Sequence, residues 1–474
     1  MSELVNVKLG SNTITGINTI KLQNADNPSE KISFSIGSGG GISGGYTVTF
    51  MSQSSAYAIY SVLPGQSIGE PTSPSVTGKS FKGWYSAETG GEEVTFPVTP
   101  AADVTYYAQF MDATIIGFSG LTDGADPTPD LIYTDDIASV PKFTTTTSGN
   151  YVNVTSGLDD YFPYSQISEY TDASGNTFVK IPKLYMKWVK TSDGTLDGVK
   201  ISNAQVDSDY FIPDAFLDPK DETCSTYLDY FAIGKYEGGG STGKMYSKTN
   251  QTCLVDLTRA QARTAARSYG IVDNLYKGYQ QMDFSMFVVY NFLCMLYFKT
   301  PNIQQVYAGR TSASSANKTG SCDGLEGMNG WNTSTQCVKM LGVENPYGNV
   351  YKWVDGVMFD GTTIYAHRLP QNFADTTSGG TNIGISRPSG GGFIVGMKPG
   401  TGAGKSYCYA TNVTGGSATT YYGDQHYSDS GLKVLRVGGG WDYAADAGLW
   451  YLDGSHDASR SFGYVGCRLA YRPL

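Results

Sequence analysis

The sequence has 474 residues, a formal net charge of −10, 16% charged residues and 40% hydrophobic residues. The acidic balance excludes a broad nucleic-acid interface, because such surfaces need clusters of Lys and Arg. No polybasic tract predicts attraction to an anionic membrane, and no apolar run reaches the roughly 18 residues of a membrane span. The 59 Gly and 35 Tyr favour strands, tight turns and loops over long helices.

The first 40 residues have the pattern of an attachment segment. Alternating polar and apolar residues at 5–9 and 31–36 predict half-buried strands. The run GSGGGISGG at 37–45 predicts a flexible linker. The N-terminus lacks the apolar stretch of a signal peptide, so we expect a protein that is released by cell lysis, as a virion component is. We expect this segment to contact other virion proteins.

Residues 41–111 are expected to form a compact β unit. Its four parts are YTVTF at 46–50, LPGQSI at 63–68, GKSFKGWY at 78–85 and VTYYAQF at 104–110. Together they resemble the internalin-type B repeat, also called the Listeria–Bacteroides repeat. The resemblance implies a small β-grasp-like spacer of a surface protein, with no catalytic chemistry and with Phe81 and Trp84 in its core.

A polar, turn-rich connector is expected at 112–149, around the Asp-Pro-Thr-Pro sequence at 126–129. It precedes a C-terminal domain of residues 150–474. The patterns at 178–188 and 230–237 predict strands in this domain.

Two helices are also expected there. Residues 257–269 follow a cap candidate, Asp256 or Thr258, and place three arginines on one face at i, i+4 and i+8. Residues 284–299 are apolar on most sides, which is typical of a helix buried by a sheet.

The seven cysteines form no C-x-x-C pair, and their odd number leaves at least one thiol unpaired within the chain. Cys322 and Cys337 flank a Gly/Asn-rich loop and have a spacing that permits a bridge; the alternative is that the cysteines are buried, reduced thiols. His367, His426 and His456 have no H-x-x-x-H spacing, so the sequence predicts no cofactor. Metal binding, including a structural Ca²⁺, stays open.

Three motifs near the C-terminus occur in a characteristic order. They are NPYGNVYKWVDG at 345–356, VGGGW at 437–441 and GCRLA at 466–470. Together they resemble the C-type-lectin-like fold of the formylglycine-generating-enzyme superfamily, whose motifs read Gly-Asn-Val-Trp-Glu-Trp, Arg-Gly-Gly-Ser-Trp and Gly-Phe-Arg. The resemblance implies an α+β multidomain chain: an N-terminal β segment, the small β-grasp-like domain, and a C-type-lectin-like domain with two helices and many loops.

The departures from these motifs favour binding over catalysis. Tyr351 and Lys352 replace a Trp and a Glu of the family, which we interpret as packing exchanges around the core anchors Trp353 and Trp441. The oxidases of this superfamily use a copper-binding cysteine pair that residues 442–464 lack. No G-x-S-x-G elbow is present. We therefore expect no enzymatic activity, with a paired-carboxylate glycosidase left as an alternative.

Residues 442–464 have the composition of an antibody loop. They contain no Lys, Glu, Gln or Met, and Tyr, Asp, Ser and Gly are prominent. In the phage tropism-determinant branch of the superfamily, this segment is diversified by a retroelement that acts on adenine-rich codons. That resemblance nominates a ligand-binding set of Asp442, Tyr443, Asp446, Tyr451, Asp453, Ser455, His456, Asp457, Ser461, Phe462 and Tyr464. Leu449, Trp450 and Leu452 are expected to be a fixed frame; the alternative is a lectin-type loop without diversification.

The function expected from the sequence is that of a phage head- or tail-fibre protein on the virion surface. It would bind a host-cell receptor, either a protein or a glycan, through the C-terminal segment, and a homotrimer is favoured by analogy with fibre proteins. The first alternative is a bacterial surface adhesin built from the same modules. The second is an enzyme that degrades host-surface glycans.

Overall fold

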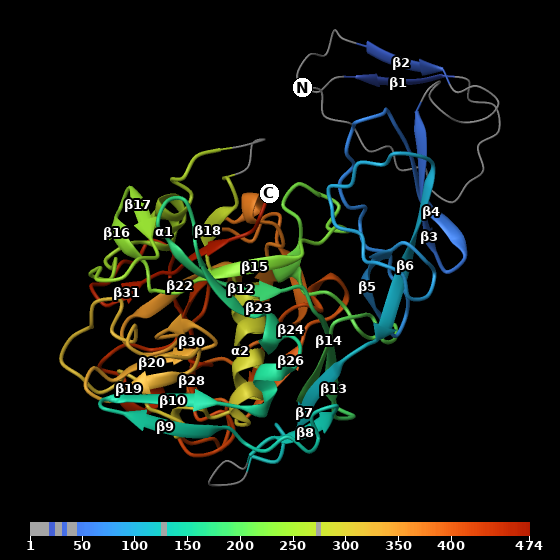
Figure 1. Ribbon diagram of the computed structural model, residues 1–474. Helices are drawn as coiled ribbons and strands as arrows, with labels where there is room; N and C mark the ends of the chain where they lie inside the picture. Colours follow the sequence, from blue (N-terminus) through green and yellow to red (C-terminus); the bar gives the residue numbers. More distant parts are fainter. Residues whose placement is uncertain (1–18, 24–30, 36–44, 125–129, 272–275) are drawn as a thin grey trace. The chain divides into compact units, whose positions relative to one another are not determined.

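The computed structural model describes residues 19–23, 31–35, 45–124, 130–271 and 276–474 (Figure 1). The strand expected at 5–9, the connector sequence at 126–129 and all but the last residue of the predicted linker lie outside these residues. The chain divides into two compact units, one of residues 1–113 with 204–206 and one of residues 114–203 with 207–474. Each unit is described by itself below.

The smaller unit contains a four-stranded sheet with the order β4-β3-β6-β5. Its strands are β3 (Tyr46–Ser52), β4 (Ser55–Val62), β5 (Lys79–Tyr85) and β6 (Val104–Asp112). The strands β3 and β6 run parallel, and the other pairs are antiparallel. Trp84 is buried against Phe50, with ring centroids 4.7 Å apart, so its expected core position is confirmed, and Phe81 packs on the same Trp but is only partly buried. A separate hairpin pairs β1 (Thr19–Gln23) with β2 (Lys31–Ser35).

The larger unit is built around one fully buried helix. All fifteen residues of α2 (Phe284–Phe298) are buried, as expected for a helix that is apolar on most sides, and Figure 1 shows this helix running through the middle of the unit. The side chain of Asp283 caps its N-terminus. Its polar side chains are hydrogen-bonded, as burial demands: the Tyr290 hydroxyl donates to the Met340 carbonyl, and the Asn291 amide donates to the Leu449 carbonyl.

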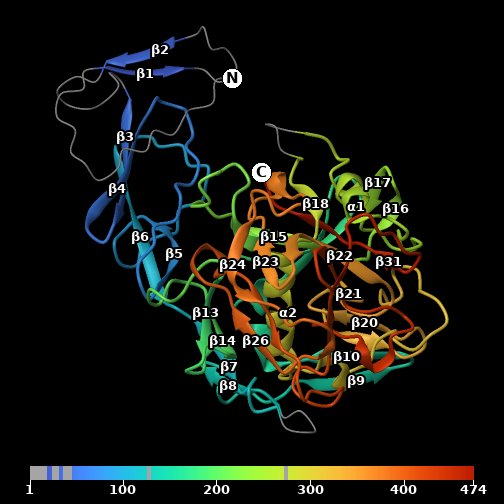
Figure 2. The same ribbon diagram turned by 180° about the vertical axis from the view of Figure 1, so that it is seen from behind.

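Several sheets surround α2 (Figures 1 and 2). The first comprises β7 (Ile115–Ser119), β8 (Ile132–Asp135), β13 (Tyr185–Lys190) and β14 (Leu196–Ser202). The second comprises β11 (Ser168–Thr171), β12 (Thr177–Pro182), β15 (Tyr230–Gly234), β18 (Tyr279–Gln281) and β32 (Leu469–Tyr471). The third comprises β9 (Thr144–Ser148), β10 (Tyr151–Thr155), β19 (Gly330–Asn332), β20 (Cys337–Met340) and β21 (Val343–Glu344). Two hairpins pair β16 (Gly239–Ser241) with β17 (Lys244–Tyr246) and β26 (Gly396–Pro399) with β27 (Cys408–Asn412).

The largest sheet has eight strands in the order β24-β23-β22-β29-β30-β28-β25, with β31 paired to β22. Its strands are β22 (Tyr351–Asp360), β23 (Thr363–Ala366), β24 (Thr381–Ser386), β25 (Gly392–Phe393), β28 (Gln425–Ser428), β29 (Leu432–Val437), β30 (Leu452–His456) and β31 (Val465–Gly466). Side chains alternate between its faces. Leu435 and Val437 of β29 join the main core with α2, whereas Val434 joins a second cluster with Trp353 and Tyr451 on the other face.

The expected α+β class with a C-type-lectin-like domain is wrong. The described residues form thirty-two strands and two short α-helices, α1 (Arg259–Ala266) and α2, so the fold is β-rich with many sheets. Both helices occur where the sequence predicted them, but they are too few to form a layer of their own. The single strand expected at 178–188 is also two strands, β12 and β13, which lie in different sheets.

Buried ion pairs join α1 to the large sheet. Arg263 binds both carboxylate oxygens of Asp355, at 2.7 and 2.8 Å, and Arg259 binds Asp375 at 2.6 Å. Lys352, which we interpreted from the sequence as a packing residue, also forms a buried ion pair. Its ammonium lies 2.9 Å from a carboxylate oxygen of Glu237. No helix in the described part of the chain is both long enough and apolar enough to cross a membrane.

Candidate binding surface

The face of the largest sheet that points away from α2 carries a buried ion pair between Arg436 and Asp453. Of the two, Asp453 belongs to the C-terminal segment 442–464. Strand pairing places Arg436 of β29 beside Trp353 of β22 on one side and beside Asp453 of β30 on the other. The guanidinium donates to the Asp453 carboxylate from Nε at 2.9 Å, and its Nη2 lies 2.8 Å from the same oxygen. Both side chains are nearly inaccessible to solvent, at 5% and 2% exposure.

Aromatic rings cover this ion pair. The Arg436 guanidinium lies 4.4 Å from the ring centroid of Tyr351, 5.2 Å from that of Phe462 and 5.8 Å from that of Tyr464. Phe462 and Tyr464 stack on each other at 5.3 Å, and Tyr443 meets Tyr351 edge-on at the same separation. Arginine attracts aromatic faces, so a single buried cation orients a ring of β22 and two rings of the loop between β30 and β31.

We define the aromatic surface as the half-buried rings of this face: Tyr427, Trp441, Tyr443, Phe462 and Tyr464. Four of the rings pack against the buried cluster of this face, Trp441 meets the Tyr464 ring edge-on, and each ring leaves part of its area open to solvent. Large rings with few torsions lose little entropy when they bind a partner, and a Tyr hydroxyl can also form hydrogen bonds. The arrangement is therefore suited to recognition.

Burial sets the ionisation of the groups beneath the surface. Burial alone would raise the pKa of Asp453, but the charge of Arg436 and the hydrogen bond from Ser455 hold it below its usual value. The pKa of Tyr451 is raised well above the normal range, first by burial and then by the neighbouring Asp453 carboxylate. Burial and the charge of Arg436 lower the pKa of His456. At neutral pH the base of the surface is thus a fixed pair of charges.

Backbone hydrogen bonds from a neighbouring loop support one side of the aromatic surface. The Ala313 N–H donates to the Trp441 carbonyl at 2.7 Å, and the Ala444 N–H donates to the Thr311 carbonyl at the same distance. The Trp441 N–H donates to the Asn349 carbonyl at 3.1 Å. The segment that follows the three glycines therefore has a defined position even though it contains little regular structure.

The structure divides the predicted ligand-binding residues into three groups. Asp442, Asp457 and Ser461 are exposed, and Tyr443, Asp446, Ser455, His456, Phe462 and Tyr464 are partly exposed. Two of the predictions are wrong, because Tyr451 is 0% exposed and Asp453 is 2% exposed. Tyr451 immediately precedes β30, and Asp453 is the second residue of that strand. Their side chains lie on the same face of the sheet, where aromatic rings and Arg436 cover them. The expected frame residues Leu449, Trp450 and Leu452 are buried, and the expected core anchor Trp441 is only partly buried.

Two contributors to this surface were missed from the sequence. Arg436 and Tyr427 precede the segment that the motifs delimit, and they reach it only because β28 and β29 pair with β30. One signal was present in the sequence: Arg436 lies between the apolar residues Leu435 and Val437 of a strand, a position where a charge needs a buried partner.

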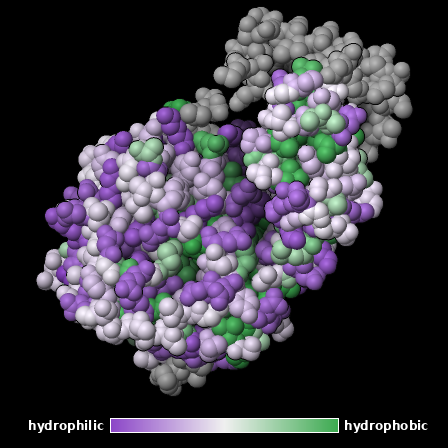
Figure 3. All heavy atoms as spheres, viewed as in Figure 1, coloured by the Kyte–Doolittle hydropathy of each residue, from purple (hydrophilic) through white to green (hydrophobic). Residues whose placement is uncertain are grey.

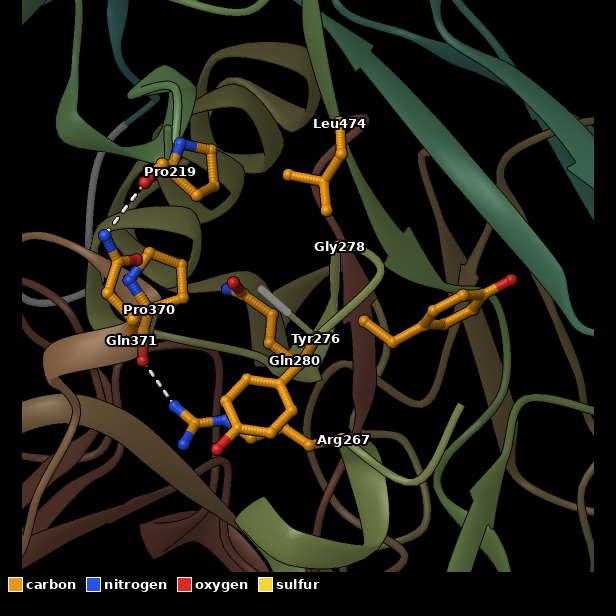
Figure 4. A pocket seen from close by; sticks show the side chains of 9 residues that line it. Pro219, Arg267, Tyr276, Gly278, Gln280, Pro370, Gln371 and Leu474 are labelled. Atoms are coloured by element: carbon orange, nitrogen blue, oxygen red, sulfur yellow. Dashed lines mark hydrogen bonds between the residues drawn. The ribbon is translucent and has the colours of Figure 1, made fainter. Parts of the chain in front are cut away.

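Metal-ligand groups and cavities are the other features of the larger unit that bear on catalysis. The three histidines form no group with metal-ligand spacing in the described part of the chain. Figure 4 shows a cavity between Arg267 and Gln371 whose volume of about 20 Å³ is suited to little more than a water molecule. A wider groove of about 600 Å³ runs along β24 and β26, and Asp193 is the one carboxylate among its lining residues. The paired carboxylates of a glycosidase are therefore not found in these two cavities.

The exposed face of the molecule in Figure 3 shows hydrophobic residues in small groups that are separated by polar ones. On this face the described residues form no broad apolar patch of the kind that marks obligate interfaces.

Comparison with known proteins identifies the smaller unit. Residues 46–109 match the Listeria–Bacteroides repeat domain family. They form a Listeria–Bacteroides repeat domain. A stretch of 45 residues is 51% identical to internalin H of Listeria monocytogenes; it covers 9% of this chain and 8% of internalin H, so the chain spans a small part of that relative.

One solved structure has a weaker likeness to this chain. The structure of PvdO from Pseudomonas aeruginosa aligns over 64% of this chain and 98% of PvdO, with 12% sequence identity and a TM-score of 0.29. This likeness is too weak to assign a fold or a function.

Proposed function

We propose that this chain is a non-enzymatic receptor-binding protein of a phage fibre, which recognises a ligand on the host cell through the aromatic surface. The observation that carries the proposal is the set of rings fixed over the Arg436–Asp453 pair. A rigid base keeps the rings in one geometry, so binding loses less conformational entropy. The exposed residues Asp442, Asp457 and Ser461 surround the rings with polar groups suited to hydrogen bonding.

The repeat domain and its similarity to internalin H suggest a surface or adhesin-like protein. The resemblance of residues 442–464 to the variable segment of phage tropism determinants supports the choice of a virion over a cell wall. The proposal includes placement on the virion, attachment through the N-terminal segment, a homotrimer and retroelement diversification of residues 442–464. It does not require a lectin-type fold.

The test compares two tyrosines of the aromatic surface with one elsewhere. We expect the double variant Tyr443→Ser/Tyr464→Ser to bind susceptible bacteria at least about tenfold more weakly than the wild type, because truncation of interface hot spots typically costs more than 1 kcal/mol each. The control is Tyr246→Ser, which changes a half-buried Tyr on β17 in a different hairpin. Equal binding of all three proteins, with unchanged thermal unfolding, would refute the assignment of the surface.

A bacterial adhesin is the second candidate, and the internalin H similarity favours it. The DNA beside the gene separates the two. A reverse transcriptase and a near-copy of the 3′ end that differs mainly at adenines support the phage protein and its diversification. Recovery of the protein from the envelope of uninfected cells supports the adhesin.

A further inference from the structure

A disulfide and a buried carboxylate meet at the edge of the third sheet. Cys322 and Cys337 are bonded, and Glu344 of β21 lies beside them (Figure 1 shows β19 and β20 of this sheet). One ligand atom from each of the three residues lies within 4.8 Å of the other two, and all three residues are inaccessible to solvent. The described residues contain no other such group of His, Cys, Asp or Glu.

The Glu344 carboxylate is held in place by backbone donors. The Gly320 N–H donates to one oxygen at 2.9 Å, and the Cys322 N–H donates to the other at 3.0 Å. The guanidinium of Arg468 donates to the backbone carbonyl of Glu344 at 2.7 Å. Burial raises the pKa of Glu344 to about 7. Burial of a carboxylate that has no cation bonded to it costs free energy. A cation bound at this position would therefore stabilise the fold.

The surrounding charges match a divalent cation with two thiolates. Lys339 lies two residues after Cys337 on β20, is buried, and donates to the Leu325 carbonyl in the loop that begins at Cys322. A doubly charged metal with two thiolates and one carboxylate has a net charge of −1, which the Lys339 ammonium would neutralise. The nearby Lys352 already pairs with Glu237 and is not available for this role.

We propose that, after reduction of the disulfide, Cys322, Cys337 and Glu344 bind one zinc ion. Thiolate sulfur and carboxylate oxygen are both zinc ligands, and three protein ligands suffice where an exchangeable group takes the fourth position. Reduction breaks the S–S bond: a dithiol such as dithiothreitol gives up two electrons and two protons, becomes a cyclic disulfide, and leaves two thiols. Zinc then displaces the proton of each thiol.

The site connects to the aromatic surface through one loop. Residues 309–325 run from the backbone contacts with Trp441 and Ala444 to Cys322. The metal would thus hold the loop to β20 in a reducing cytosol, and the disulfide would hold it after release into an oxidising medium. The same cross-link would be kept in both compartments. The inference itself depends on the three ligands and not on what the aromatic surface binds.

Co²⁺ is the probe, because tetrahedral cobalt thiolates absorb in the near-ultraviolet and visible ranges. The full chain is reduced with dithiothreitol, freed of reductant under nitrogen and titrated with Co²⁺. We expect one equivalent to bind with a thiolate-to-cobalt band, which Zn²⁺ bleaches because it binds such a site more tightly. The oxidised protein should show no band.

Variants locate the metal. Cys322→Ser and Cys337→Ser should lose the thiolate band, and Glu344→Gln should weaken Co²⁺ binding by at least about tenfold, the size of effect seen for groups even one shell farther out. Cys408→Ser, a buried thiol of β27 in the main core, is the matched control and should bind like the wild type. Circular dichroism checks each fold, and Glu344→Gln carries the test if a serine variant unfolds.

A reduced wild type without the band overturns the proposal, as does a band that survives in both serine variants. Because these readouts report only the metal, a negative result leaves the receptor-binding proposal unaffected.

Discussion

Removal of the Asp453 carboxylate should destabilise the larger unit rather than abolish a surface contact. In Asp453→Ala, the guanidinium of Arg436 would stay buried at 5% exposure and lose its anionic partner at 2.8 Å. Loss of one partner of a buried ion pair costs about 3 to 5 kcal/mol. The Ser455 N–H and hydroxyl, at 2.9 and 2.5 Å from the same carboxylate, would also lose their acceptor.

Thermal unfolding followed by tryptophan fluorescence measures this loss. All the tryptophans except Trp84 lie in the larger unit, so the signal reports mainly on that unit. At roughly 2 °C per kcal/mol for a domain of this size, Tm should fall by about 6 to 10 °C. The control Asp457→Ala removes an exposed carboxylate paired with Lys433 and should lower Tm far less than Asp453→Ala does, because solvent screens an exposed ion pair.

A double variant separates the unpaired charge from other effects. Replacement of both partners, in Arg436→Met/Asp453→Leu, should recover most of the stability, because apolar side chains of similar size tolerate burial. The reasoning is refuted if Asp453→Ala and Asp457→Ala lower Tm by the same small amount. It is also refuted if the double variant is no more stable than Asp453→Ala.

Three further predictions follow from buried groups. Tyr451→Ala should lower the free energy of unfolding, measured by urea titration, by about 3 to 5 kcal/mol. Tyr464→Ala removes a half-exposed ring and should lower it much less. Similar losses in the two variants would mean that the two rings are equally buried. Burial lowers the pKa of His426 from 6.5 to about 4, so the folded state resists a proton that the unfolded state accepts. Stability should therefore fall by about 3 kcal/mol as the pH drops from 6.5 toward 4, and His426→Asn should lack this part of the pH profile. The bond between Cys322 and Cys337 closes a loop with a sequence separation of 15, so dithiothreitol should lower stability by about 3 kcal/mol in metal-free buffer and have no such effect on Cys322→Ser.

The sequence was sufficient for features that depend on neighbouring residues. The core position of Trp84 was implied by the resemblance to the B repeat, whereas the cap candidate Thr258 of α1 and the largely apolar run of α2 are local patterns. The same holds for the frame residues Leu449 and Leu452, whose apolar side chains stand out in a polar segment. These predictions agree with the structure because short-range periodicity and composition determine them.

Only the tertiary structure decided which polar residues of the C-terminal segment reach solvent. Tyr451 and Asp453 are buried, whereas Tyr443 and Asp457, which are the same residue types, reach solvent. Nothing in the neighbouring sequence distinguishes the first pair from the second. The difference arises because β30 pairs with β29 and brings Asp453 to Arg436, a residue seventeen positions earlier. The fold class also depends on strand pairing. The two helices were predicted at the right places, but their sequences do not show how many sheets surround them. Burial is a property of the partners a side chain meets across the sheet, and the sequence of one strand does not specify those partners.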